Sequence, residues 1–146
     1  MYYEEAAETL ILQAANKARS MGHSYVGSAH ILLALTEATG MAGLLLRGAG
    51  METELVRSAA SVLYGTGTPD LPLPQGLTLE AESILYMAGQ EARQLGSRRV
   101  CALHILLALL RQQNCAAWEL MLLGCVDMDT LLRRPLIIFA VRRSSR

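Results

Sequence analysis

The chain has 146 residues, of which 52% are hydrophobic and 18% charged, so it can bury a core and is not a disordered protein. Thirteen basic residues balance thirteen acidic ones, so the net charge favours no particular class of partner. No apolar run reaches the roughly 20 residues of a membrane helix, and the lack of a G-x-x-x-x-G-K-[ST] phosphate loop excludes a P-loop ATPase motor from this sequence.

The N-terminal part predicts a long amphipathic helix. Apolar residues recur at the spacing of one helix face from Ala7 to Met21. Acidic residues at its start suit the positive end of the helix dipole. Gly22 is placed to end the helix in the left-handed conformation that glycine adopts easily.

A second helix carries the hexapeptide HILLAL, which begins at His30, and Ser28 is placed to cap it. We interpret His30 as a buried structural residue that hydrogen-bonds the backbone and fixes the entry of this helix. Shorter helices are expected at about 42–47 and from about Met51.

Residues 65–76, GTGTPDLPLPQG, carry three of the four prolines and predict a linker. After it, Thr78 suits the N-cap of a fifth helix and Gly96 suits its end. His104 heads a second HILLAL helix and receives the same structural interpretation as His30.

The last part of the chain predicts two more helices. One is expected at about 116–123 and the other from near Asp127. Pro135 should end that eighth helix early, because the residue before a proline resists the helical conformation.

Shifting the second half back by 74 residues reveals an internal repeat. Residues 14–35 and 88–109 are identical at 11 of 22 positions, including all six of HILLAL. The sequence therefore predicts an all-α fold of two tandem four-helix repeats related by a pseudo-twofold axis, with eight short helices in one compact bundle. The expected divisions are a first repeat at 1–64, the linker at 65–76, a second repeat at 77–134 and a tail at 135–146, with 1–134 as one structural domain.

We expect no catalytic site, metal or cofactor, and hence no enzyme. Cys101 and His104 have C-x-x-H spacing, but a structural zinc site needs four ligands and no second pair is evident. The first repeat also has Gly27 in place of Cys101. A cysteine–histidine nucleophile pair would lack an acidic third member.

Three cysteines, an odd number without C-x-x-C, favour buried free thiols and a reducing, cytoplasmic setting. An acidic N-terminal stretch stands where the apolar part of a signal peptide would lie. The three cysteines are Cys101, Cys115 and Cys125.

Several apolar and basic residues keep more than one interpretation. Trp118 most simply fills the core, although it could dock a partner, and the tyrosines Tyr2, Tyr3 and Tyr25 could line a peptide groove. Leu136–Val141 could pack across the bundle, pair with another chain or begin a further segment. An arginine-rich end follows it, most simply a solvated one.

The repeated pattern resembles the N-terminal double repeat of the Clp ATPases, in the ClpA and ClpC branch of AAA+ protein unfoldases. ARSMGHSYVGSAHILLAL and EARQLGSRRVCALHILLALL carry the resemblance, which covers about residues 1–134. It implies a non-catalytic module that receives adaptor proteins and protein substrates ahead of an ATPase ring.

The same resemblance implies two positions for reading phosphorylated arginine. ClpC-like members use a threonine at the start of the first helix of each repeat and a glutamate before the HILL histidine, which suit phosphate and guanidinium. The threonine positions are Glu4 and Thr78 here, and the glutamate positions are Ala29 and Leu103. The first repeat thus lacks both groups and the second keeps only Thr78, so we expect phosphoarginine binding to be absent or weak.

We expect an adaptor- and substrate-docking module of a cytoplasmic Clp-type protein quality-control system, with no membrane partner. Its surface should lie at the groove between the repeats and at the starts of the first and fifth helices. An alternative is an accessory or regulatory subunit that docks on a Clp ring or protease core. A weaker alternative is a helical nucleic-acid binder that uses the arginine-rich tail, for which binding would depend steeply on salt.

Overall fold

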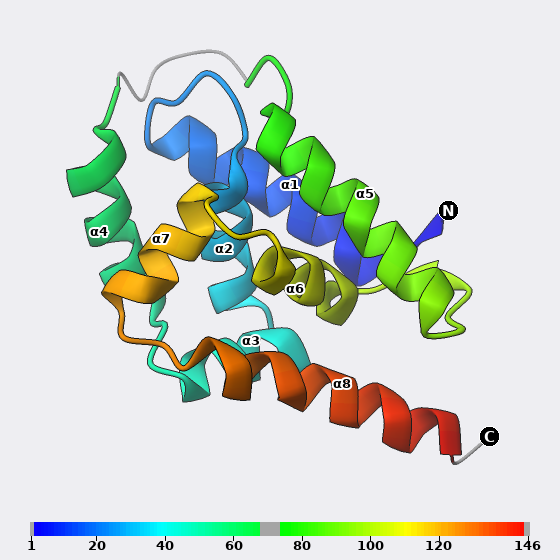
Figure 1. Cartoon of the computed structure of the whole chain (residues 1–146). Coiled ribbons are helices and arrows are strands. Elements are labelled where there is room, and N and C mark those ends of the chain that lie inside the picture. Colours follow the sequence, from blue (N-terminus) through cyan, green and yellow to red (C-terminus); the bar gives the residue numbers. More distant parts are fainter. Residues whose placement is uncertain (1, 68–73, 145–146) are drawn as a thin grey trace.

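The computed structural model describes residues 2–67 and 74–144, so residues 68–73 of the predicted linker lie outside the described residues. The described part contains eight helices and one pair of short strands (Figure 1). In chain order they are β1 (Tyr2–Tyr3), α1 (Glu5–Ser20), α2 (Ser28–Glu37), α3 (Met41–Gly48), α4 (Thr53–Tyr64), α5 (Leu79–Gln94), β2 (Arg99–Val100), α6 (Ala102–Arg111), α7 (Ala116–Leu123) and α8 (Met128–Ser144).

The predicted helical double repeat is confirmed. Helices α1 to α4 form the first repeat and α5 to α8 the second, and α1 packs on α2 as α5 packs on α6. The two HILLAL helices are the core, since nine of ten residues of α2 and eight of ten of α6 are buried. A helix that is apolar on all sides is stable only when other helices cover it.

Gly22 and Gly96 end α1 and α5 in the predicted conformation, with φ of +71° and +73°. The two ends are closed by the same bonds: the N–H of each glycine donates to the carbonyl three residues earlier, and the next N–H donates to a carbonyl five residues earlier. Gly22 also lies against the backbone of Gly67, where a Cβ atom would collide. The end of α1 therefore anchors the start of the linker.

The expected caps hold for one helix and fail for another. Thr78 accepts the N–H of Ala81 at 3.1 Å, as predicted for the start of α5. The predicted cap by Ser28 is wrong, because Gly27 is the N-cap and Ser28 is already the first residue of α2. The buried Ser28 hydroxyl donates instead to Glu80 of the second repeat, at 2.7 Å.

The prediction that Pro135 ends the last helix is wrong. Helix α8 continues through Pro135 to Ser144, so the described part of the predicted tail is helical. Leu131, Pro135 and Phe139, four residues apart, are buried along one face of α8. Packing of this stripe outweighs the one backbone hydrogen bond that the proline cannot donate.

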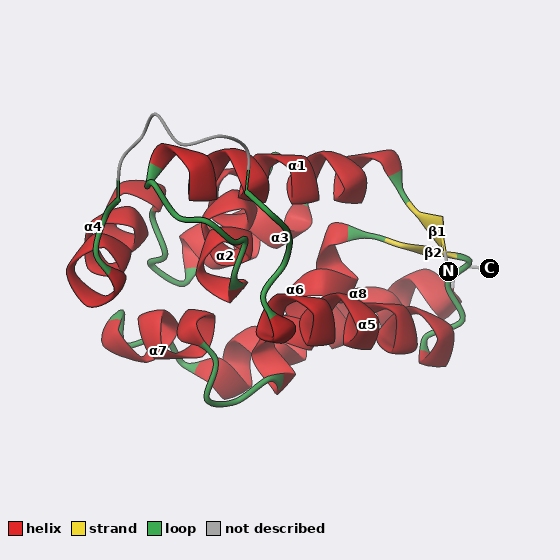
Figure 2. Cartoon of the chain, turned by 90° about the horizontal axis from the view of Figure 1, so that it is seen from above, coloured by secondary structure: helices red, strands yellow, loops and turns green. Residues whose placement is uncertain are grey.

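The two repeats exchange their leading segments, which the all-α prediction did not include. Tyr3 pairs with Val100 in the parallel β1–β2 ladder (Figure 2). Leu77 forms a parallel bridge with Val26. The two pairings are equivalent, since 3 and 77, like 26 and 100, differ by 74. Each repeat thus begins alongside the segment that precedes the HILLAL helix of the other repeat.

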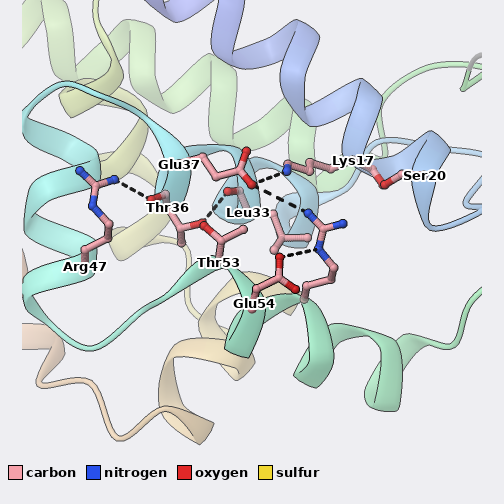
Figure 3. A network of polar contacts seen from close by, with 9 residues as sticks. Lys17, Ser20, Leu33, Thr36, Glu37, Arg47, Thr53 and Glu54 are labelled. Carbon is pink, nitrogen blue, oxygen red and sulfur yellow. Dashed lines mark hydrogen bonds and ion pairs between the residues drawn. The ribbon is translucent and has the colours of Figure 1, made fainter.

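Equivalent ion pairs join the first two helices of each repeat, with their charges exchanged. Lys17 of α1 lies 2.6 Å from Glu37 of α2, whereas at the equivalent positions Glu91 of α5 pairs with Arg111 of α6. Figure 3 shows that Glu37 belongs to a polar network along the end of α2. Within it, the Thr36 hydroxyl contacts Thr53 of α4 at 2.8 Å and Arg47 of α3 donates to the Thr36 carbonyl, so α2 is tied to its neighbours.

The cysteines are not all buried. Cys115 is buried and Cys101 partly so, but the prediction is wrong for Cys125, which is exposed in the turn between α7 and α8. Trp118 packs against the core while remaining partly exposed.

No single helix in the described ranges has the length and apolar composition of a membrane span. The pair α2 and α3 meets these two criteria only together, and the chain bends by 97° between them.

Candidate functional site

Two cavities occupy equivalent positions with respect to the repeat, one beside the start of each HILLAL helix. The first-repeat pocket has a volume of about 480 Å³ and the second-repeat pocket about 540 Å³. Five pairs of lining residues correspond when the numbering is shifted by 74: Met21 and Leu95, His23 and Ser97, Gly27 and Cys101, His30 and His104, and Thr78 and Glu4. The pockets are therefore two copies of one feature, and their differences reflect sequence changes.

Each pocket is built from both repeats. Glu4 donates its N–H to the Val100 carbonyl at 2.8 Å, and Thr78 donates its N–H to the Val26 carbonyl at 2.9 Å. These bonds bring the start of α5 to the first-repeat pocket and the start of α1 to the second-repeat pocket. Folding of both repeats is needed to complete either site.

The first-repeat pocket has mainly apolar walls. Ala29, Ala60 and Ala116 line it, and Leu79 at its rim is 84% exposed. An exposed leucine beside a concave apolar surface is typical of a binding groove.

A polar junction closes one side of this pocket where three helices begin. The Ser28 hydroxyl of α2 accepts the Ala117 N–H of α7 at 3.0 Å while it donates to Glu80 of α5. The same Glu80 oxygen accepts the Ala116 N–H at 3.2 Å. The junction holds the two repeats and the start of α7 in a fixed relation around the pocket.

Tyr64, the last residue of α4, lines the same pocket and contacts α7. Its hydroxyl donates to Glu119 at 2.8 Å and lies 3.3 Å from the Ala116 carbonyl. Burial raises the pKa of Tyr64, and the hydrogen bond to Glu119 raises it further. Tyr64 therefore acts as a neutral donor that bridges α4 and α7.

A histidine pair closes the inner end of the first-repeat pocket. His30 Nδ1 accepts the Gly27 N–H at 2.9 Å, so the proton of the neutral His30 ring lies on Nε2. That Nε2 lies 2.7 Å from His23 Nδ1, and His23 Nε2 lies 2.8 Å from the Gly65 carbonyl. One consistent pattern follows, in which His30 donates to His23 and His23 donates to Gly65.

The second-repeat pocket is arginine-lined. Its walls include Arg98 just before β2, Arg99 in β2, and Arg142 and Arg143 near the end of α8, with the single carboxylate of Glu4. The arginine-rich end of the chain thus forms one wall of a cavity.

His104 in this pocket repeats only part of the His30 arrangement. Its Nδ1 accepts the Cys101 N–H at 2.9 Å, and Phe139 stacks on its ring with centroids 4.5 Å apart. Its Nε2 has no hydrogen-bond partner among the described residues, although His104 is only 1% exposed. Ser97 stands at the position that His23 occupies in the first repeat.

Both histidines are neutral near pH 7. Burial lowers the pKa of His30 to about 4, helped by His23, and burial lowers the pKa of His104 to about 4, helped by Arg142. Each ring therefore offers one N–H donor at Nε2 and uses its other nitrogen to fix a helix start.

The residues that the resemblance singled out fall into different groups than expected. Thr78 lines the first-repeat pocket together with Ala29, and Glu4 lines the second-repeat pocket. Leu103 is buried, 4% exposed, and belongs to neither lining. The grouping of Glu4 with Ala29 was wrong because the leading segments cross between repeats.

Sequence reasoning missed His23, Tyr64 and the arginine pair at 98–99. The shift by 74 holds a signal for His23, since the first repeat has histidine where the second has Ser97. Tyr25, proposed for a peptide groove, is exposed, and its hydroxyl donates to Gln75 at 2.9 Å.

The C-x-x-H pair serves the backbone geometry of α6, since His104 Nδ1 accepts the Cys101 N–H. Within residues 2–67 and 74–144, no three His, Cys, Asp or Glu side chains gather as metal ligands.

Comparisons with known proteins agree with this architecture. A family model described as the Clp repeat (R) N-terminal domain matches residues 2–123. The chain is 34% identical over 115 residues to the chaperone protein ClpC3, chloroplastic, of Oryza sativa subsp. japonica, and 35% identical over 111 residues to ClpC1, chloroplastic, of Arabidopsis thaliana. These alignments cover 78% and 75% of this chain but 12% of each relative.

Two solved structures share the fold. The N-terminal domain of the caseinolytic protease associated chaperone ClpD from Arabidopsis thaliana aligns with a TM-score of 0.77 at 20% identity, over 92% of this chain and 95% of that one. The Hsp104 N-terminal domain from Candida albicans also aligns with a TM-score of 0.77, at 21% identity, over 93% and 90% of the two chains.

Proposed function

The chain belongs to the Clp repeat N-terminal domain family, and from that premise we propose that it is a non-catalytic docking module of a Clp-type protein unfolding and degradation system. It captures adaptor proteins or unfolded segments of substrates and presents them to an ATPase ring. The chain spans 12% of the length of the relatives named above, so the ring and its activity are part of the proposal.

The first-repeat pocket is the observation that carries this proposal. It combines apolar walls, the exposed Leu79 and the polar group of Thr78 in a cavity of about 480 Å³. Such a cavity suits one or two apolar side chains of an extended peptide, with the backbone held at the polar rim. The polar junction at Ser28 keeps the pocket open without a ligand.

Phosphoarginine is not the ligand we propose. Ala29 stands where a guanidinium-pairing glutamate is expected, and the nearby Glu80 already accepts hydrogen bonds from Ser28 and the Ala116 N–H. An arginine-phosphorylated peptide that bound at micromolar affinity, and lost it on Thr78→Ala, would contradict this point.

The alternative is an accessory subunit that uses the same surface to dock on a Clp ring or protease core. The two functions differ in what binds: unfolded clients in the first case and the assembled machine in the second. A reducing, cytoplasmic setting is part of both proposals, because the exposed Cys125 is a free thiol.

Binding of a permanently unfolded model protein, followed by fluorescence anisotropy, tests the docking function. Leu79→Glu should weaken this binding at least tenfold, because it places a charge at the apolar rim of the first-repeat pocket. Leu12→Glu is the matched control, since Leu12 is 67% exposed on α1 and does not line that pocket. Equal losses in both variants, or no binding by the unaltered chain, would contradict the proposal.

A further inference from the structure

We propose that the second-repeat pocket binds acidic peptide segments and recognises their carboxylate groups. This inference rests on the proposed docking function and adds a ligand class to it. It assigns the two pockets different tasks, with apolar side chains held in the first repeat and carboxylates in the second.

The charge of the lining points to an anion. Four guanidinium groups from two separate parts of the chain, Arg98–Arg99 and Arg142–Arg143, surround a cavity that holds the single carboxylate of Glu4. A guanidinium presents a planar fork of donors that matches the two oxygens of a carboxylate. The two arginine pairs can therefore engage neighbouring acidic side chains of one peptide.

An unpartnered donor at the inner end of the pocket points to the same ligand. His104 lines the cavity and is 1% exposed, and its Nε2 has no partner among the described residues. Because Nδ1 accepts the Cys101 N–H, the neutral ring carries its proton on Nε2. A buried donor without an acceptor is costly, and an oxygen of the ligand would satisfy it.

The first repeat shows what closes such a site. There His23 Nδ1 accepts a hydrogen bond from the N–H at the equivalent His30 Nε2, over 2.7 Å. The His30 donor therefore has a partner without any ligand. The second repeat has the shorter Ser97 at that position, and Ser97 itself lines the pocket. A carboxylate that enters past Ser97 would take the role that His23 plays in the first repeat.

A peptide fits these features better than a nucleic acid. The chain has no net charge, so its overall charge does not attract a polyanion. The arginines line a cavity of about 540 Å³, which holds a few side chains, whereas nucleic-acid binding uses an extended basic stripe.

The test is a set of anisotropy titrations with the whole chain. The probes are a labelled peptide of alternating acidic and apolar residues, the same peptide with Gln and Asn for Glu and Asp, and a single-stranded oligonucleotide of equal charge. We expect the acidic peptide to bind at least tenfold more tightly than the other two, and its affinity to fall as salt is raised from about 50 to about 300 mM.

Two variants locate the binding. Arg98→Glu should weaken binding of the acidic peptide at least fivefold. Ser97→His should weaken this binding about threefold, because the new histidine gives His104 Nε2 a hydrogen-bond partner. Arg133→Glu is the matched control, because it makes the same charge change at an exposed residue of α8 outside the lining. His23→Ser should have no effect, since the first-repeat pocket has no arginine.

Equal binding of the neutral peptide, or equal losses in Arg98→Glu and Arg133→Glu, would overturn the inference. Tighter binding of the oligonucleotide that Arg98→Glu abolishes would reassign the pocket to nucleic acid. If the acidic peptide does not bind while the unfolded protein still binds in a Leu79-dependent way, only this inference is contradicted. If neither the peptide nor the unfolded protein binds, the proposed docking function is contradicted as well.

Discussion

His23 Nδ1 lies 2.7 Å from His30 Nε2, and the second repeat has no counterpart of this contact. The difference follows from one position, since Ser97 replaces His23 where the two repeats otherwise share the histidine, its backbone bond and its pocket. In the first-repeat pocket the histidine Nε2 therefore has a protein partner, whereas in the second-repeat pocket it has none among the described residues.

Stability should fall in mild acid because of the two buried histidines. Their pKa of about 4 in the folded chain lies below the usual value of 6.5, so the unfolded chain binds more protons between these values. The stabilisation is complete above pH ~6.5 and is lost as the pH falls toward 4. We expect a loss of about 1 to 2 kcal/mol per histidine at about pH 5, measured by urea unfolding at several pH values.

Carboxylates also titrate in this range, so a variant is needed as a control. The double change His30→Asn and His104→Asn keeps an acceptor near each Nδ1 position but removes both ionisable rings. It should be less stable than the unaltered chain at neutral pH and should lose less stability toward pH 5. The same slope in both proteins would show that the histidines do not cause the pH dependence.

The ion pair between Glu91 and Arg111 should tolerate an exchange of charges. Arg111→Ala leaves the carboxylate of Glu91, a residue only 7% exposed, without its partner and should cost about 2 kcal/mol. The double change Glu91→Lys and Arg111→Glu should recover most of that loss, because Lys17 and Glu37 already use this polarity in the first repeat. Chemical unfolding of the three proteins measures the recovery; a double variant as unstable as Arg111→Ala would contradict it.

Ser28→Ala should destabilise the junction between the repeats. The change removes a donor to Glu80 and an acceptor for the Ala117 N–H, and both groups lie away from full solvent, so we expect a loss of about 1 to 3 kcal/mol. Ser58→Ala, at an exposed serine of α4, should change stability by less than about 0.5 kcal/mol. Thermal unfolding compares them, and equal effects would argue against the junction.

The end of α8 should contribute to stability through Phe139. Its ring is 7% exposed and stacks on His104, so Phe139→Ala should cost about 2 to 4 kcal/mol. Val141→Ala in the same helix, at a residue 62% exposed, should have little effect. If both changes are neutral in thermal unfolding, the second half of α8 does not pack as described.

The helices were predictable because their signals are local and occur twice. Apolar spacing placed α1 and α5, and Gly22 and Gly96 placed their ends. The end of α8 was mispredicted because the rule for the residue before a proline considers only local backbone conformation. The continuation of the helix depends instead on three buried residues along one of its faces. Packing of that kind is not visible in a window of a few residues.

The pockets were harder to predict because they combine distant parts of the chain. β1 and β2 have two residues each, too few for an alternating pattern, so the crossing of the leading segments left no periodic signal. Without that crossing, Thr78 could not be grouped with Ala29. The arginines at 98–99 and 142–143 meet only because α8 continues past Pro135.

Chemical-shift mapping by NMR, with an unfolded model protein added to the isotope-labelled chain, is the measurement to make first. Docking predicts that the largest perturbations fall on Ala29, Tyr64, Thr78 and Leu79, the residues of the first-repeat pocket, with smaller ones on the arginine-lined pocket of the second repeat. Perturbations confined to the exposed faces of α1 and α3, or no perturbation at saturating client, would contradict a docking function for these pockets.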